Sequence, residues 1–122
     1  MTPEFPLDLA SLRSLYQSRT AKPTDVISAV YDRIGTGPLG PVWISLVPRK
    51  YAMAQARELE NDPLAAARPL YGVPFAVKDN FDLSGLATTA GCPAYAYQPA
   101  QNASVVQALI DAGAIPDRKS VV

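Results

Sequence analysis

The 122-residue sequence contains no histidine and a single cysteine, Cys92. A lone cysteine cannot form a disulfide within the chain. Without histidine, a zinc site is implausible, and neither a Ser-His-Asp nor a Cys-His catalytic pair can be built from these residues. Acid–base chemistry near neutral pH then falls to carboxylates, or to a lysine whose pKa is lowered by burial. The missing imidazole therefore directs attention to the lysines.

Neither sign of charge predominates, and no long apolar run occurs. Eleven basic and eleven acidic side chains cancel, and they are scattered, so we expect no nucleic-acid partner. No stretch approaches the roughly 18 apolar residues of a membrane span, and residues 1–6 lack the features of a signal peptide. We therefore expect a cytoplasmic protein with no membrane partner. Hydrophobic residues make up 48% of the chain, which is enough for one packed domain or part of one.

Apolar residues recur at helical spacing in four segments, and β-branched or aromatic runs separate them. The expected helices are Asp8 to Arg19 with Asp8 as N-cap, Pro23 to Ile34 ended by Gly35, Arg49 to Glu60, and Ala103 to Ala112 ended by Gly113. The buried faces expected for the last two helices are Tyr51, Ala52, Ala56 and Leu59, and Val105, Val106, Leu109 and Ile110. The expected strands are 42–47 and 70–77, with a third beginning at 114–116. Pro74 favours an edge position or an irregular stretch. This alternation predicts an α/β fold with helices around an incomplete mixed sheet.

Lys78 follows a mainly apolar run and is the best candidate for chemistry in the chain. From the residues alone, a solvated lysine at a strand end is the more ordinary interpretation, because lysines are rarely buried without a partner. Asp79 beside it would stabilise the ammonium form and oppose action as a base. Residues 79–93 then predict a polar loop able to approach a ligand, shaped by the pair Thr88-Thr89.

The other reactive side chains favour structural roles. Neither Ser84 nor Ser104 lies in a Gly-rich nucleophile turn, so we expect turn or capping roles for both. Cys92, in a Gly-Cys-Pro turn, is expected to be a small buried residue. Tyr95 and Tyr97 are expected to lie in the core or, as the alternative, to border a substrate pocket. None of these residues competes with Lys78 as a catalytic group.

The sequence resembles the N-terminal part of the amidase signature family, whose members hydrolyse or transfer amide groups. The motifs that carry the resemblance are residues 72–80 (Gly-Val-Pro-Phe-Ala-Val-Lys-Asp-Asn), Gly85 and residues 88–91 (Thr-Thr-Ala-Gly). Residues 104–106 and 112–114 fit the same family, so the resemblance extends from the first helix to about Pro116. Residues 42–44, 69–75 and 92–97 are similar in particular to the urea-degrading branch of the family.

This resemblance implies a Ser-Ser-Lys triad in which Lys78 is the base. It places both serines in a Gly/Ser-rich stretch that residues 1–122 do not contain, and it implies a small-molecule amide substrate and no metal or organic cofactor. The chain alone is then expected to be inactive. Other amidases of the family, the family's amidotransferase that makes amidated transfer RNA, and a non-catalytic product remain open, and so does assembly into a homo-oligomer.

The resemblance weakens near the end of the chain. The family continues with Gly-Lys-Thr-Asn, whereas this chain has Arg118-Lys119-Ser120-Val121. Lys119 is similar in position to the family's lysine, but its neighbours differ. We therefore expect residues 1–116 to form the N-terminal part of an amidase domain, and residues 117–122 to form a divergent end.

Overall fold

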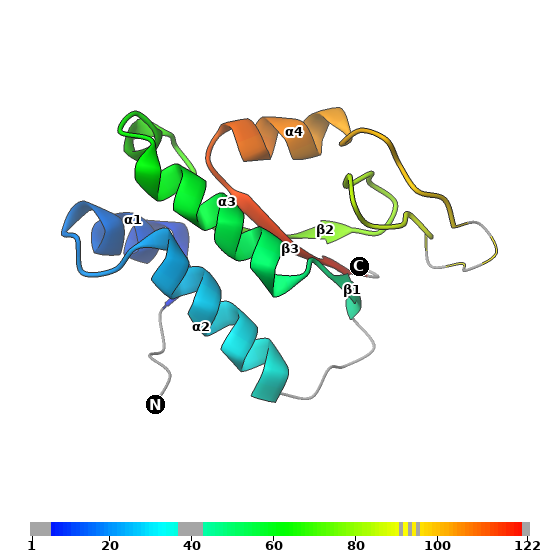
Figure 1. Ribbon diagram of the computed structural model, residues 1–122, viewed down its shortest axis with the longest axis horizontal. Helices are drawn as coiled ribbons and strands as arrows, with labels where there is room; N and C mark the ends of the chain where they lie inside the picture. Colours follow the sequence, from blue (N-terminus) through cyan, green and yellow to red (C-terminus); the bar gives the residue numbers. More distant parts are fainter. Residues whose placement is uncertain (1–5, 37–42, 91, 93, 95, 121–122) are drawn as a thin grey trace.

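The protein is described by a computed structural model that covers residues 6–36, 43–90, 92, 94 and 96–120. Its elements (Figure 1) are α1 (Leu9–Gln17), α2 (Pro23–Thr36), β1 (Trp43–Leu46), α3 (Arg49–Asn61), the short 3₁₀ helix η1 (Ala65–Ala67), β2 (Pro74–Lys78), α4 (Ser104–Asp111) and β3 (Ile115–Ser120). The α/β class predicted from the sequence is confirmed.

The sheet is mixed and places the last strand in its centre. The strand order is β1-β3-β2, with β3 antiparallel to β1 and parallel to β2. Pro74 is the first residue of β2, which has no further neighbour among the described strands, so its missing N–H removes no ladder bond. The expected edge position is thus confirmed. Strand β3, expected to begin at 114–116, continues through the largely buried residues 117–120.

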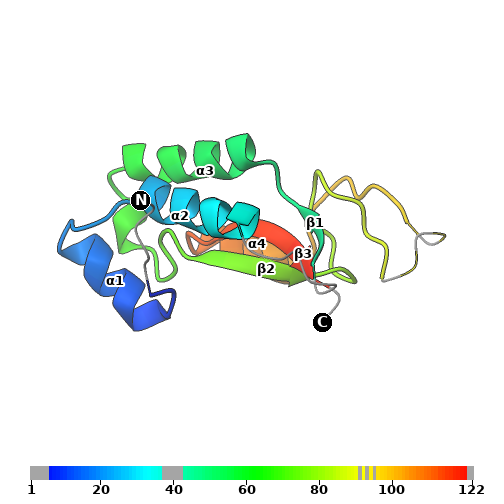
Figure 2. The ribbon, with the colours of Figure 1, turned by 90° about the horizontal axis from the view of Figure 1, so that it is seen from below.

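The two faces of the sheet carry different elements. Helices α2 and α3 lie over one face (Figure 2), where Ile115 joins Ile27 and Tyr31 in the core. The second cluster joins Val77 and Phe75 of β2 to Leu83, Val106 and Ile110, which come from the following loop and α4. Because side chains alternate along a strand, Lys78 points away from the face that carries Val77.

Most predicted helix ends agree with the structure. Asp8 caps α1, since its Oδ2 accepts a hydrogen bond from the Ser11 backbone N–H at 3.0 Å. Helix α2 begins at Pro23 as predicted, but it continues through Gly35 to Thr36. The prediction that Gly35 ends this helix is therefore wrong. A glycine inside a helix costs only about 1 kcal/mol relative to alanine, which a last turn tolerates.

Two large side chains expected in the core are exposed instead. Tyr51 is 57% exposed and Val105 is 51% exposed, whereas Ala52, Ala56 and Val106 are buried. Helix α3 packs against α2 through the two alanines, whose small size permits a close approach. The buried face of α3 is therefore narrower than its apolar pattern indicates.

The predicted strand 70–77 begins later because of Gly72. This residue has φ +69°, a left-handed conformation that breaks an extended chain before Pro74. The Tyr16 hydroxyl donates to the Gly72 carbonyl oxygen at 2.7 Å, and a Cβ at position 72 would lie 2.8 Å from Tyr16 Cζ. The glycine of the resemblance motif thus allows α1 to pack closely on the entry to β2.

Asp117 is an unusual core residue on β3. It lies where the register between β2 and β3 shifts, between the pairs Phe75–Pro116 and Ala76–Arg118, and it is fully buried. One carboxylate oxygen accepts from Arg118 Nη1 at 2.8 Å, and Oδ1 has no partner among the described residues. Burial raises the pKa of Asp117 to about 6, although Arg118 acts against this increase.

We expect Asp117 to make the chain less stable as the pH rises. A carboxyl group with a raised folded-state pKa stabilises fully below its unfolded value of 3.8 and loses that contribution as the pH rises through about 6. The free energy of unfolding of Asp117→Asn, measured in urea, should therefore gain about 3 kcal/mol relative to the wild type between pH 4 and pH 8. A difference that does not change with pH would contradict the burial of an ionisable Asp117.

Candidate active site

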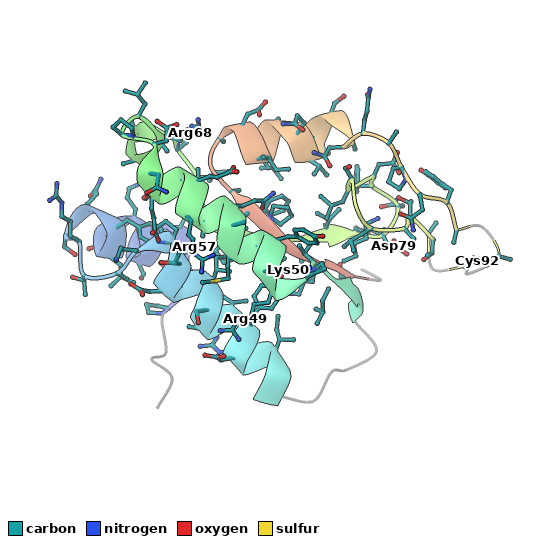
Figure 3. The ribbon with its side chains drawn as sticks, in the orientation of Figure 1. Arg49, Lys50, Arg57, Arg68, Asp79 and Cys92 are labelled. Carbon is teal, nitrogen blue, oxygen red and sulfur yellow. The ribbon has the colours of Figure 1, made fainter. Side chains whose placement is uncertain are left out.

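The candidate site lies where β2 passes into the loop of residues 79–103, beside the end of β3. Figure 3 shows Asp79 at this place. The backbone N–H of Asp79 donates to the Ser120 carbonyl oxygen at 2.9 Å, so the β2–β3 ladder extends one residue beyond β2. This bond fixes the backbone directions of Lys78 and Asp79 relative to the sheet.

Lys78 is the last residue of β2 and pairs in register with Ser120. Its side chain is exposed, and its amine makes no hydrogen bond or ion pair with any residue in the described part of the chain. An exposed lysine at a strand end is what the residues alone indicated. The poorly solvated pocket implied for the family's lysine is not formed by these residues, and the role of Lys78 as a base stays a prediction.

Asp79 has its partners on the other side of the strand. It is 2% exposed and accepts hydrogen bonds from the Thr89 backbone N–H at 3.2 Å, from the Thr89 hydroxyl, and from Lys119 Nζ at 3.3 Å. Burial acts to raise the pKa of Asp79, but the bonds from Thr89 and Lys119 outweigh burial and hold it below the usual value. Asp79 is thus paired with Lys119, and its expected effect on the ammonium form of Lys78 stays a prediction.

Lys119 is the residue that sequence reasoning missed. It is fully buried, and besides Asp79 its amine donates to the Ala87 carbonyl oxygen at 3.1 Å and to Thr88 Oγ1 at 3.2 Å. It pairs in register with Val77, on the face opposite Lys78. The available signal was its similarity in position to a family lysine, whose neighbouring residues differ from those of Lys119.

A second carboxylate extends this network toward the loop. Asp82 accepts hydrogen bonds from the Tyr97 hydroxyl and from Thr88 Oγ1, the latter at 2.8 Å, and these bonds lower the pKa of Asp82. Thr88 and Tyr97 also exchange two backbone hydrogen bonds. Tyr97 is 42% exposed, so its expected place in the core is wrong, and Tyr95 lies outside the described residues.

The remaining candidates take no part in this network. Cys92 is exposed on the outer part of the loop, away from Asp79 (Figure 3), so its expected burial is wrong. The loop projects beyond the packed core, and no described element covers the thiol. The Ser84 backbone N–H donates to Asn102 Oδ1 at 2.7 Å, and Ser104 is the first residue of α4. Ser84 lies in a turn as predicted, whereas the N-cap of α4 is Ala103 and has no side-chain capping bond, so the expected capping role of Ser104 is wrong.

No metal site and no membrane helix is found in the parts of the chain described above. No three Cys, Asp or Glu side chains gather closely enough to hold a metal ion. No helix is long and apolar enough to cross a bilayer.

A helix pair over a mixed sheet, with a lysine at the end of an edge strand and a threonine loop behind it, defines the chain as an α/β segment. The profile of the family described as Amidase matches residues 25–121. The chain belongs to the amidase family. The matched range includes Lys119, and the boundary expected at residue 116 stays a prediction.

Individual relatives agree with this assignment. Urea amidolyase of Saccharomyces cerevisiae is 41% identical over 90 residues, which cover 74% of this chain and 5% of that protein. The A subunit of glutamyl-tRNA(Gln) amidotransferase from Lawsonia intracellularis is 34% identical over 117 residues, 94% of this chain and 24% of that protein. The solved structure of Kluyveromyces lactis allophanate hydrolase is 36% identical with a TM-score of 0.80, and the match covers 95% of this chain and 19% of that one. The chain thus spans a quarter or less of each of these relatives.

Proposed function

We propose that this chain is the N-terminal part of an amide C–N hydrolase of the Ser-Ser-Lys type that converts allophanate to ammonia and carbon dioxide. The observation that carries the proposal is the motif around Lys78, which ends β2 in a segment with 41% identity to a urea amidolyase and 36% identity to an allophanate hydrolase. The substrate is taken from these relatives, and Lys78 is proposed as the general base.

In the proposed mechanism the unprotonated Lys78 amine accepts a proton through a bridging serine while a second serine attacks the amide carbon. The same proton then passes to the leaving nitrogen, and water releases the acyl group from the serine. Both serines come from residues beyond the 122 described by this sequence. In the chain alone Lys78 is exposed to water, so we expect further residues of the domain to cover it and exclude solvent.

A second candidate function is the amidotransferase reaction. The similarity to the A subunit of glutamyl-tRNA(Gln) amidotransferase extends over 94% of this chain, more than the 74% matched in the yeast urea amidolyase. Its identity is lower, at 34% against 41%. We rank allophanate hydrolysis first because the solved allophanate hydrolase also matches along 95% of the chain.

A non-catalytic product is the third alternative. The outer edge of β2 pairs with no other described strand, and an open edge of this kind recruits further chain or a second molecule. If the segment supports amide hydrolysis or transfer when it is placed in a complete amidase domain, this alternative is excluded.

The proposal predicts that residues 1–122 release no ammonia from allophanate when purified alone. A chimera in which they replace the matching segment of Kluyveromyces lactis allophanate hydrolase should release it. Ammonia is measured with a coupled dehydrogenase assay, and the unmodified Kluyveromyces lactis enzyme serves as the positive control. Turnover by the isolated chain would contradict the need for both serines. A folded chimera that cleaves other amides but not allophanate would exclude the proposed substrate.

A further inference from the structure

We infer that Lys119 is a positioning residue for Lys78: it holds and neutralises the Asp79 carboxylate on the opposite face of β2, and so leaves the Lys78 amine without a carboxylate counter-ion. The inference rests on the proposed role of Lys78 as a base. It adds to that role a second lysine, one that touches neither the substrate nor the reacting atoms.

The geometry separates two neighbouring side chains. Lys78 and Asp79 are consecutive residues on an extended backbone, so their side chains point to opposite faces. Lys119 pairs with Val77 and therefore lies on the Asp79 face, where its amine is 3.3 Å from Asp79 Oδ1. Thr89 binds the same carboxylate through its backbone N–H and its hydroxyl. Asp79 is thus fixed in a direction that turns it away from Lys78.

The charges explain why a buried cation is placed there. Asp79 anchors the loop at Thr89, but an uncompensated carboxylate one residue from Lys78 would favour the protonated amine. The buried ammonium of Lys119 cancels that charge at short range in a poorly solvated place. A proton acceptor at position 78 can then coexist with the anchoring carboxylate at position 79.

The other charged groups around the pair have partners of their own. On the Lys119 face, Asp82 binds Thr88 and the Tyr97 hydroxyl. On the Lys78 face, the neighbouring cation of β3 is Arg118, which forms an ion pair with Asp117 at 2.8 Å. Lys119 also donates to Thr88, and its charge adds to the hydrogen bonds from Tyr97 and Thr88 in lowering the pKa of Asp82. Asp79→Asn is therefore the variant that changes the charge beside Lys78 without removing Lys119.

The test measures how fast the Lys78 amine reacts with acetic anhydride at a fixed pH of 8 in the 122-residue chain. Only unprotonated amines react, and mass spectrometry of peptides reports each lysine separately. The exposed Lys22 and Lys50 serve as internal references. The variants are Lys119→Gln, which keeps hydrogen-bond donors but removes the charge, Asp79→Asn, the double variant, and Lys119→Arg as the conservative exchange. Circular dichroism first confirms that each one is folded.

We expect Lys119→Gln to slow acetylation of Lys78 by about threefold, Asp79→Asn to accelerate it by a similar factor, and the double variant and Lys119→Arg to match the wild type. The rates of Lys22 and Lys50 should not change. If Lys119 has only a structural role, the two single variants should change the acetylation rate of Lys78 in the same direction, or not at all. Either result would overturn the inference. If one single variant fails to fold, the other single variant and the double variant still test the inference. Faster acetylation of Lys78 in the double variant than in the wild type would show that Lys119 does not neutralise Asp79. The assay needs no turnover, so its failure leaves the proposed hydrolysis untouched.

Discussion

Lys78→Ala is expected to lower kcat for ammonia release by the allophanate hydrolase chimera at least about a thousandfold, because loss of one member of a catalytic triad costs factors of this size. Alanine removes the only amine at the end of β2 and leaves the backbone pairing with Ser120 intact. In the proposed mechanism, the nucleophilic serine then lacks a group to accept its proton. KM should change much less than kcat, because the amine acts in the transition state rather than in substrate binding.

Lys50→Ala is the matched control for this experiment. Lys50 is an exposed lysine on α3 (Figure 3). Its Nζ lies 5.2 Å from the centroid of the Tyr51 ring. Its loss should leave kcat within about twofold, because substitution of an exposed side chain usually has a small effect. Equal losses from both variants would indicate damage to the fold of the chimera. Unchanged turnover by a folded Lys78→Ala chimera would remove Lys78 as the base, and with it the proposed mechanism.

The sequence predicted the elements better than it predicted their buried faces. Helical periodicity and the caps at Asp8 and Pro23 depend on neighbouring residues, so the start of each helix could be inferred locally. The exposure of Tyr51 and Val105 depends on how much of each helix the rest of the chain covers. Local pattern carries no information on that coverage.

The sequence predicted only part of the candidate site, because local pattern does not show which distant residues meet. Lys78 stands out because it follows an apolar run, and its position at the end of β2 agrees with that pattern. The partner of Asp79 is 40 residues away, on a strand whose final residues were expected to diverge. Their pairing depends on the parallel register of β2 and β3, which no local motif encodes. A long-range ion pair of this kind becomes visible only once the sheet order is known.

Lys119→Met is expected to lower the free energy of unfolding of the 122-residue chain by about 3–5 kcal/mol at pH 7, because it leaves a buried carboxylate without its counter-ion. Methionine keeps most of the volume and removes the charge together with the hydrogen bonds to Ala87 and Thr88. Urea unfolding followed by circular dichroism measures the change. Lys50→Met, at an exposed position, should shift the value by no more than about 0.5 kcal/mol.

The pH dependence of this loss identifies its cause. The pKa of Asp79 is lowered in the folded chain, so its stabilising contribution is present above the unfolded value of 3.8 and disappears as the pH falls through the folded-state value. The difference between wild type and Lys119→Met should therefore be largest at neutral pH and should shrink as the pH falls through the lowered folded-state pKa of Asp79, where its carboxylate becomes protonated. Adding Asp79→Asn to Lys119→Met should recover part of the loss at pH 7, because it removes the unpaired charge. A loss of the same size at every pH, unrelieved by Asp79→Asn, would mean that Lys119 stabilises the chain through packing alone.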